Sequence, residues 1–264
     1  MGRFGSLLIS LMLLTVGLLS AQEPPTADSA LPQRVAPPSE SATAQELEHQ
    51  GDTLRGQKAY LDSVDYYRAA IKKSDTAILH NKAGISLFQL HRDGEAKKEY
   101  ERAIKLDGDY AEVHNNLGAL HYYSRRYGPA VKEYRKAIRL SEENATFHVN
   151  LGTAYFSEKD FDGAIREYRR AKELDSGVFD RQPSGGVSIR LISSTDLGHF
   201  HYLMAQVSAS HGDMERCRLY LSKANEEGYP IRDALRDGQF AGLRKDPQFV
   251  AFLRSLKPPA SANE

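Results

Sequence analysis

The sequence lacks the features that mark most enzymes, metalloproteins and disulfide-bonded proteins. It has a single cysteine, Cys217, so no intramolecular disulfide and no cysteine-based zinc cluster can form. It contains no Walker loop and no GxGxxG, GxSxG, HExxH or CxxC motif. Tryptophan is absent, and 14 tyrosines and 10 phenylalanines supply the aromatic bulk. We therefore expect a non-enzymatic protein without a cofactor or a metal.

Neither sign of charge is in excess, because 35 Lys and Arg balance 35 Asp and Glu in 264 residues. A nucleic-acid-binding protein needs excess positive charge to displace counterions from phosphates. The balance therefore argues against nucleic acid as a partner. The length is enough for one large domain or two small ones. The apolar fraction of 41% is ordinary for a globular protein with a polar tail.

The N-terminus carries an uncharged apolar stretch. Arg3 precedes it, and no residue from Phe4 to Ala21 is charged. A positive start, an apolar run and a small residue at its end are typical of a secretory signal peptide, which we predict over residues 1–21. Leu19 stands where a small residue is preferred, and the stretch approaches a bilayer-spanning length, so an uncleaved anchor is the alternative. The first reading predicts a periplasmic or secreted chain, and the second a chain tethered to the inner membrane and facing the periplasm.

Two polar segments are expected to remain without a fixed structure. Residues 22–43 contain five prolines among Ser, Ala and Thr. Such a segment cannot bury enough apolar surface to offset its chain entropy, so it is predicted to be a disordered linker. Residues 257–264 are predicted to be a disordered tail.

Four positions recur every 34 residues along the middle of the chain. They are Gly84, Gly118 and Gly152; Ala96, Ala130 and Ala164; Tyr100, Tyr134 and Tyr168; and Ala103, Ala137 and Ala171. Four positions that agree over three copies predict a tandem repeat. A glycine within a helical pattern costs about 1 kcal/mol relative to alanine, so its recurrence indicates a close approach of two helices. The tyrosine lies on the same helix face as the two alanines.

This pattern resembles the tetratricopeptide repeat (TPR) family, whose pattern is Leu-Gly, then an aromatic residue, then Ala, an aromatic residue and Ala. Residues 111–144 match it at Leu117, Gly118, Ala130, Tyr134 and Ala137. The resemblance implies an all-α, right-handed solenoid of about five helix-turn-helix repeats. A weaker first copy begins near Ala44 and is one residue shorter. The usual terminal proline is missing from every copy.

The repeat pattern divides the rest of the chain. Residues 44–176 are predicted to hold repeats 1 to 4, and residues 198–231 a fifth repeat. Between them, residues 177–197 break the register and are predicted to be a short β-like insertion. The alternation of Val187, Ile189 and Leu191 predicts a strand, which could pair with Val178-Phe179 as a β-hairpin. Residues 232–256 are predicted to be capping helices, which a stacked array requires.

Histidine recurs at one position of the repeats, in His80, His114, His148 and His201. Stacked repeats present equivalent residues in parallel, whereas a zinc site needs three or four convergent ligands. We therefore predict packing contacts between repeats for these histidines and no metal site. Cys217 lies at a small-residue position, which favours a buried, inert thiol.

The TPR resemblance also implies that the first helix of each repeat lines a concave groove. The predicted ligand residues in that groove are Asn81, Lys82, Phe88, Asn115, Asn116, Tyr122, Asn150 and Phe156. A carboxamide can donate to and accept from a peptide backbone at once, and an aromatic ladder suits apolar ligand side chains. Asparagine ladders of this kind hold extended peptides in some TPR proteins. The alternative is that Asn and Tyr are simply frequent at these positions in the family.

The sequence thus predicts a non-enzymatic scaffold of the cell envelope that binds a protein or peptide in its concave groove. The alternative is a structural assembly factor for an envelope machine, such as a pilus or a polysaccharide exporter, that docks through its convex face. An anchored chain would add a membrane tether through its N-terminal segment.

Overall fold

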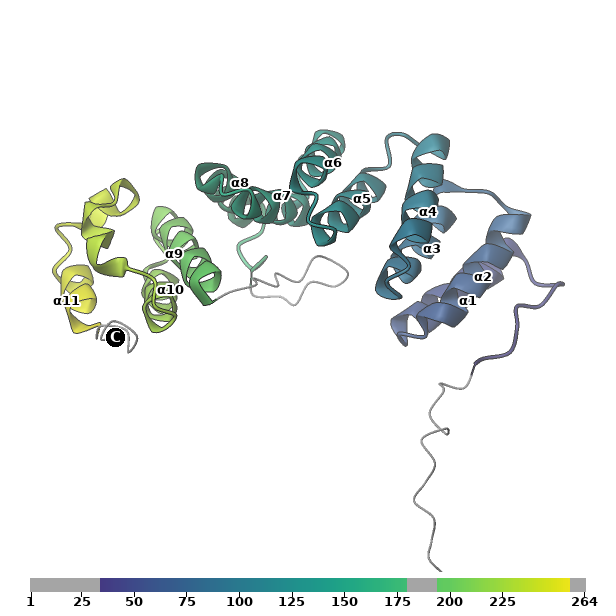
Figure 1. The fold of residues 1–264 in the computed structure, drawn as a ribbon, viewed down its shortest axis with the longest axis horizontal. Helices are drawn as coiled ribbons and strands as arrows, with labels where there is room; N and C mark the ends of the chain where they lie inside the picture. Colours follow the sequence, from purple (N-terminus) through teal and green to yellow (C-terminus); the bar gives the residue numbers. More distant parts are fainter. Residues whose placement is uncertain (1–33, 180–193, 257–264) are drawn as a thin grey trace, which may run out of the picture. The chain divides into compact units, whose positions relative to one another are not determined.

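The computed structural model describes residues 34–179 and 194–256, and every regular element in these ranges is a helix (Figure 1). The α-helices are α1 (Ala44–Gly56), α2 (Tyr60–Lys73), α3 (Ala77–Gln89), α4 (Asp93–Leu106), α5 (Ala111–Tyr123), α6 (Tyr127–Leu140), α7 (Ala145–Ser157), α8 (Phe161–Leu174), α9 (Ser194–Ser210), α10 (Met214–Glu226) and α11 (Pro247–Ser255). Two short 3-10 helices, η1 (Ile231–Arg236) and η2 (Gly238–Leu243), lie between α10 and α11. The predicted all-α class is confirmed.

The helices pack as consecutive pairs within the unit that spans Pro37–Glu264. The pairs are α1 with α2, α3 with α4, α5 with α6, α7 with α8 and α9 with α10. Each pair then packs on the next one, and α1, α3, α5 and α7 also contact one another in sequence. Because each pair buries its apolar face against its neighbours, this is the stacked arrangement of a helical solenoid. The predicted helix-turn-helix repeats are confirmed.

The first repeat begins with a capping box. The Thr43 hydroxyl accepts a hydrogen bond from the backbone amide of Glu46, and the Glu46 carboxylate accepts one from the Thr43 amide. These two bonds satisfy amides that would otherwise be unpaired at the helix start. The end of the predicted linker also contacts this repeat, because Lys73 Nζ donates to the Glu40 carbonyl at 2.8 Å.

Several predicted segments lie outside the described residues. They are the signal peptide or anchor at residues 1–21, the linker up to residue 33, the β-hairpin strand within the insertion, and the tail at residues 257–264. Helix α9 begins at Ser194, within the predicted insertion and before Gly198. In the part of the chain that the structure does describe, no helix is both long enough and apolar enough to cross a bilayer.

A glycine–tyrosine contact holds the two helices of each repeat together. Tyr67, Tyr100, Tyr134 and Tyr168 are at most 1% exposed. A Cβ added to the facing glycine would come within 2.5–2.8 Å of the tyrosine ring in each case, at Gly51, Gly84, Gly118 and Gly152. Real Cβ atoms do not approach a ring this closely, so the absence of a side chain is what allows the helices to pack.

The turn between the two helices of a repeat has the same backbone each time. Lys58, His91, Arg125 and Lys159 all have a φ of 56–63°, in the left-handed region that L-residues rarely adopt. Gly212 takes the equivalent place in the fifth pair, with a φ of 71°. The turn geometry is therefore kept even where the residue is not glycine.

The C-terminal elements cover the last helix pair. Phe240 of η2 and Phe249 of α11 are fully buried in a cluster with Cys217 and Leu221 of α10. Leu243, Phe252 and Leu253 pack against this cluster from outside. The predicted helical cap is confirmed. Burial raises the pKa of the Cys217 thiol to about 12, which keeps the thiol protonated and unreactive at neutral pH.

The glycine–tyrosine contact predicts the effect of one added methyl group. We expect Gly118→Ala to lower the free energy of unfolding by about 1–3 kcal/mol, because the new Cβ overpacks the Tyr134 ring. The measurement is urea unfolding of the purified chain. Gly94→Ala on α4 is the control. Its Cβ would meet no atom of the described residues within 4 Å, so the substitution should be neutral or stabilising. Equal effects of the two substitutions would contradict the packing role.

Candidate ligand-binding face

The eight predicted ligand residues lie on three consecutive first helices, and we call their common surface the first-helix face. Three lie on α3, three on α5 and two on α7. Burial divides them into two groups. Asn81, Asn115, Asn150 and Phe156 are buried, whereas Lys82, Phe88, Asn116 and Tyr122 are half-buried. The second group is the one that a ligand could reach directly.

The asparagines of this face hydrogen-bond to one another across the repeats. Asn116 Nδ2 donates to Asn81 Oδ1 at 2.8 Å, and Asn150 Nδ2 donates to Asn115 Oδ1 at 2.7 Å. Asn81 Nδ2 in turn donates to the Tyr110 hydroxyl at 3.2 Å. The carboxamides that were expected to meet a peptide backbone therefore connect α3 to α5 and α5 to α7. Their role in ligand binding stays a prediction.

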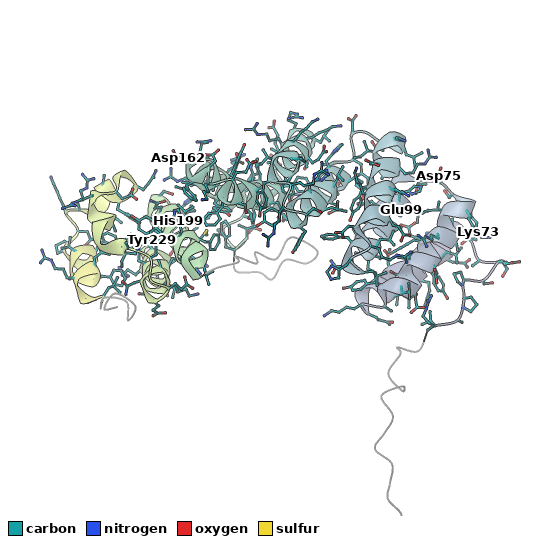
Figure 2. The ribbon with its side chains drawn as sticks, in the orientation of Figure 1. Lys73, Asp75, Glu99, Asp162, His199 and Tyr229 are labelled. Atoms are coloured by element: carbon teal, nitrogen blue, oxygen red, sulfur yellow. The ribbon has the colours of Figure 1, made fainter. Side chains whose placement is uncertain are left out.

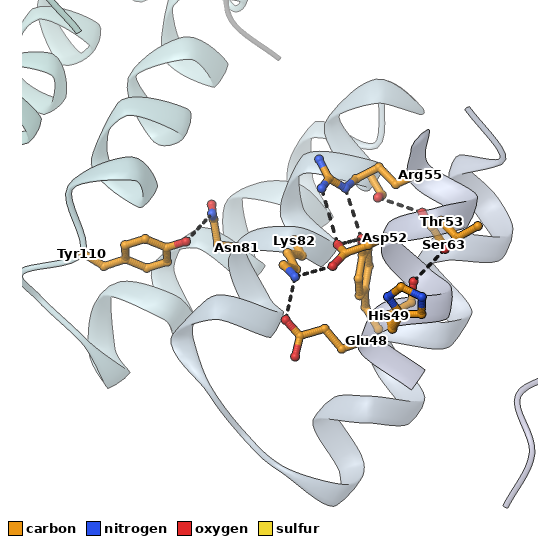
Figure 3. A network of polar contacts seen from close by, with 11 residues as sticks. Glu48, His49, Asp52, Thr53, Arg55, Ser63, Asn81, Lys82 and Tyr110 are labelled. Carbon is orange, nitrogen blue, oxygen red and sulfur yellow. Dashed lines mark hydrogen bonds and ion pairs between the residues drawn. The ribbon is translucent and has the colours of Figure 1, made fainter. Parts of the chain in front are cut away.

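Lys82 is bound by two carboxylates of the first repeat (Figure 3). Its Nζ lies 2.6 Å from Glu48 Oε1 and 2.6 Å from Asp52 Oδ2. Burial works against both charged partners, but their mutual hydrogen bonds outweigh it, so the pKa of Lys82 is raised and that of Asp52 is lowered. The ammonium group thus ties α3 to α1, and its charge is already balanced on this face.

The predicted aromatic ladder is divided between two clusters. Phe88 and Tyr122 belong to the first, which we call the aromatic cluster and which also contains Tyr123 and Tyr127. The Tyr123 ring lies edge-on to Phe88 at 5.3 Å and to Tyr122 at 6.0 Å. Tyr122 also contacts the Tyr127 ring at 5.5 Å. Tyr123 is 43% exposed, so the cluster presents an aromatic surface to solvent.

Phe156 is part of a different, buried cluster. Its ring contacts Phe161 at 5.6 Å, His199 at 5.6 Å and Phe200 at 6.1 Å. Only 6% of Phe156 is exposed. It packs α7 against α8 and α9, and a ligand on the first-helix face would reach it only if these helices moved apart.

The repeated histidines contact glutamates that lie on the second helix of the repeat or, for His201, directly after it. The Nδ1 atom lies 2.5–2.8 Å from a carboxylate oxygen in the pairs His80–Glu99, His114–Glu133 and His148–Glu167, and 2.6 Å away in His201–Glu227. Nε2 of His114 and of His148 lies near the carbonyl of the preceding turn, at 3.2 and 3.1 Å. Nε2 of His80 lies instead 2.6 Å from an Asp75 carboxylate oxygen; Asp75 and Glu99 are labelled in Figure 2.

His80, His114 and His148 therefore join the two helices of their own repeat rather than neighbouring repeats. Only their Nε2 contacts, to the turn before the helix, lie between repeats as predicted. Among residues 34–179 and 194–256, the structure brings together no group of three or more His, Cys, Asp or Glu side chains that could hold a metal ion.

The asparagine contacts predict a cost for removing one carboxamide. We expect Asn150→Ala to lower the free energy of unfolding by about 1–3 kcal/mol, because Asn115 Oδ1 would lose its partner at a buried position. Urea unfolding measures the loss. Thr146→Ala on the same helix is the control, since Thr146 is exposed and its change should stay within about 0.5 kcal/mol. A neutral Asn150→Ala would show that the amide contact does not stabilise the array.

The histidine–glutamate pairs predict a dependence of stability on pH. The hydrogen bond with His114 lowers the pKa of Glu133, against the opposing effect of burial. Because the folded pKa lies below the unfolded value of about 4.3, the pair stabilises the protein fully above that value. The contribution is lost as the pH falls through the folded pKa.

We therefore expect Glu133→Gln to cost about 1–2 kcal/mol at neutral pH and much less near pH 3. Urea unfolding at the two pH values tests this. Glu101→Gln serves as the control, because Glu101 is half-exposed in its pair with Lys97 and should contribute under about 0.5 kcal/mol. An equal loss from Glu133→Gln at both pH values would rule out a contribution from the carboxylate charge.

Comparisons with known proteins agree with this architecture. Residues 116–178 match a family model described as tetratricopeptide repeat, and residues 84–124 match one described as TPR repeat. No curated protein sequence matches the chain significantly.

Solved structures with a similar fold share little sequence with the chain. MamA 41-end from Desulfovibrio magneticus RS-1 has a TM-score of 0.50 at 14% identity, over 69% of this chain and 92% of that one. A crystal structure of MamA protein has a TM-score of 0.49 at 17% identity, over 74% and 95%. YrrB, described as a TPR protein with an unusual peptide-binding site, has a TM-score of 0.47 at 17% identity, over 73% and 90%. At these identities the likeness concerns the fold alone.

Proposed function

Because the chain belongs to the tetratricopeptide repeat family, we propose that it is a non-enzymatic scaffold that binds an extended segment of a partner protein on its first-helix face. Helix pairs of this fold present rigid side chains on consecutive helices, and such surfaces suit ligands that run along the stack.

The main support for this proposal is the aromatic cluster. Phe88, Tyr122 and Tyr123 come from two consecutive first helices, and Tyr123 stays 43% exposed although its ring is held by two neighbours. Rigid aromatic rings lose little conformational entropy on binding and commonly anchor protein interfaces. Two exposed cations, Arg125 and Arg126, follow Tyr123 after one intervening residue. The cluster therefore suits a ligand segment with an apolar or aromatic side chain next to an acidic one.

The cellular location that we propose rests on the sequence alone. Residues 1–21 have the pattern of a secretory signal peptide, which supports an exported scaffold in the periplasm or outside the cell. If the segment is retained, the same pattern supports a tether to the inner membrane with the repeats facing the periplasm.

In a second candidate function, the partner docks on the second helices instead. Leu61 on α2, Leu106 on α4 and Leu219 on α10 are 39%, 39% and 50% exposed. Apolar side chains at these positions favour docking through the outer, second-helix surface, as a structural assembly factor of a pilus or a polysaccharide exporter would do. Substitutions on the two surfaces distinguish the two functions.

The proposed function predicts that Tyr123→Ala weakens peptide binding. The probe is a displayed library of random dodecapeptides, from which binders to the purified repeat region are selected and then titrated. We expect Tyr123→Ala to weaken a selected peptide about tenfold or more, because the exposed anchor ring is lost. Stability should change little, since the ring is only partly buried.

Leu219→Ala is the matched control, because Leu219 is an exposed apolar side chain on a second helix. It should leave binding unchanged. If Leu219→Ala or Leu106→Ala weakens binding and Tyr123→Ala does not, the assembly factor that docks through its second helices is the better account.

A further inference from the structure

The hydroxyl groups of the repeated tyrosines do not all find the same partner. In the first repeat, the Tyr67 hydroxyl donates to Asp52 Oδ1 at 2.8 Å. In the fourth repeat, the Tyr168 hydroxyl donates to Thr153 Oγ1 at 3.2 Å. Asp52 and Thr153 occupy the same position, directly after the packing glycine of the first helix. In both repeats the tyrosine of the second helix therefore extends to the first helix, and its hydroxyl lies beside the residue that follows the packing glycine.

In the second and third repeats this acceptor is missing, because Ile85 and Ala119 follow the packing glycine there. Ala119 stands at the position of Asp52 and Thr153, and its methyl group cannot accept a hydrogen bond. The Tyr134 hydroxyl is closed to solvent, and no residue within 34–179 or 194–256 forms a hydrogen bond with it. A buried hydroxyl without a partner keeps the full penalty of losing its contact with water, so native proteins rarely retain one without a reason.

The surroundings indicate what a partner would have to be. Burial raises the pKa of Tyr134 well above its usual value, so the hydroxyl stays protonated and can donate a hydrogen bond at any physiological pH. Tyr122 of the aromatic cluster packs against the buried cluster that contains Tyr134. The unpaired donor thus lies next to the surface that we assign to ligand binding.

We propose that the first-helix face has a subsite at Ala119, where the Tyr134 hydroxyl donates a hydrogen bond to a carbonyl or carboxylate oxygen of a bound peptide. Ala119 offers no acceptor at the position where the first and fourth repeats carry their own. The ligand must displace a covering side chain, because the hydroxyl is closed to solvent in the free protein. This inference rests on the proposed function and assigns the ligand oxygen to a particular repeat.

The test compares Tyr134 and Tyr168, which occupy the same position of two repeats and differ in the hydrogen-bond partner of the hydroxyl. It uses a selected dodecapeptide whose affinity falls in Tyr123→Ala, and it measures that affinity together with the unfolding midpoint of the free protein. Tyr134→Phe should weaken binding about tenfold and should not lower the midpoint, because no described residue bonds to the hydroxyl before binding. Tyr168→Phe is the matched control: it should lower the midpoint and leave binding unchanged, since its hydroxyl is already bound to Thr153.

Ala119→Ser adds an internal acceptor at the position where Thr153 serves the fourth repeat. We expect it to weaken binding as Tyr134→Phe does, because the hydroxyl would then be engaged within the protein. Combining the two substitutions should weaken binding no further, since both remove the same hydrogen bond.

Each adverse result has a distinct meaning. If Tyr134→Phe binds as the wild type does while Tyr123→Ala still weakens binding, the subsite is wrong and the proposed function stands. If Tyr134→Phe lowers the unfolding midpoint as much as Tyr168→Phe, the hydroxyl has an internal partner and the inference is overturned. If no peptide depends on Tyr123, both the proposed function and the subsite fail.

Discussion

The contact between a glycine of the first helix and a tyrosine of the second helix is the constraint on which every repeat depends. An added Cβ would lie within 2.5–2.8 Å of the ring in each of the four repeats, so the two helix axes are brought as close as the backbone allows. A buried tyrosine fills the space between them, and its ring orientation is fixed by that contact. In the first and fourth repeats the tyrosine hydroxyl donates to the residue after the glycine, Asp52 or Thr153. The second and third repeats carry Ile85 and Ala119 at this position, and neither side chain can accept a hydrogen bond.

The same packing determines which side chains of the first-helix face remain available. It sets neighbouring first helices at a distance at which carboxamides meet, and Asn81, Asn115, Asn116 and Asn150 therefore satisfy one another. Lys82 is balanced in the same way by Glu48 and Asp52. What remains for a partner is the aromatic cluster, where Tyr123 is exposed. Binding specificity on this face would thus depend on shape and aromatic contact more than on charge.

The sequence predicted the helix pairs well, because a 34-residue period with glycine and tyrosine at fixed places is a local signal that several copies repeat. It could not show that Asn116 pairs with Asn81, since that contact joins neighbouring positions of two repeats and depends on how the helices stack. The histidine–glutamate contacts could have been predicted from the sequence but were not. A histidine and a glutamate recur 19 residues apart in the second, third and fourth repeats, and this constant spacing indicates a paired contact within the repeat. The unpaired Tyr134 hydroxyl required the structure, because only comparison with Thr153 reveals that Ala119 lacks an acceptor.

The asparagine contacts have a consequence for how such a chain can change length. Asn116 reaches back to Asn81, and Asn150 reaches back to Asn115, so both bonds join the same two positions of adjacent repeats. Removal of the 34 residues 111–144 would bring Asn150 to the place of Asn116, opposite Asn81. The joint would then be made by the same pair of carboxamides as before. Whole repeats are therefore interchangeable units at this point of the chain. A gene duplication or deletion of a whole number of repeats keeps the first-helix face continuous. A change of any other length breaks it.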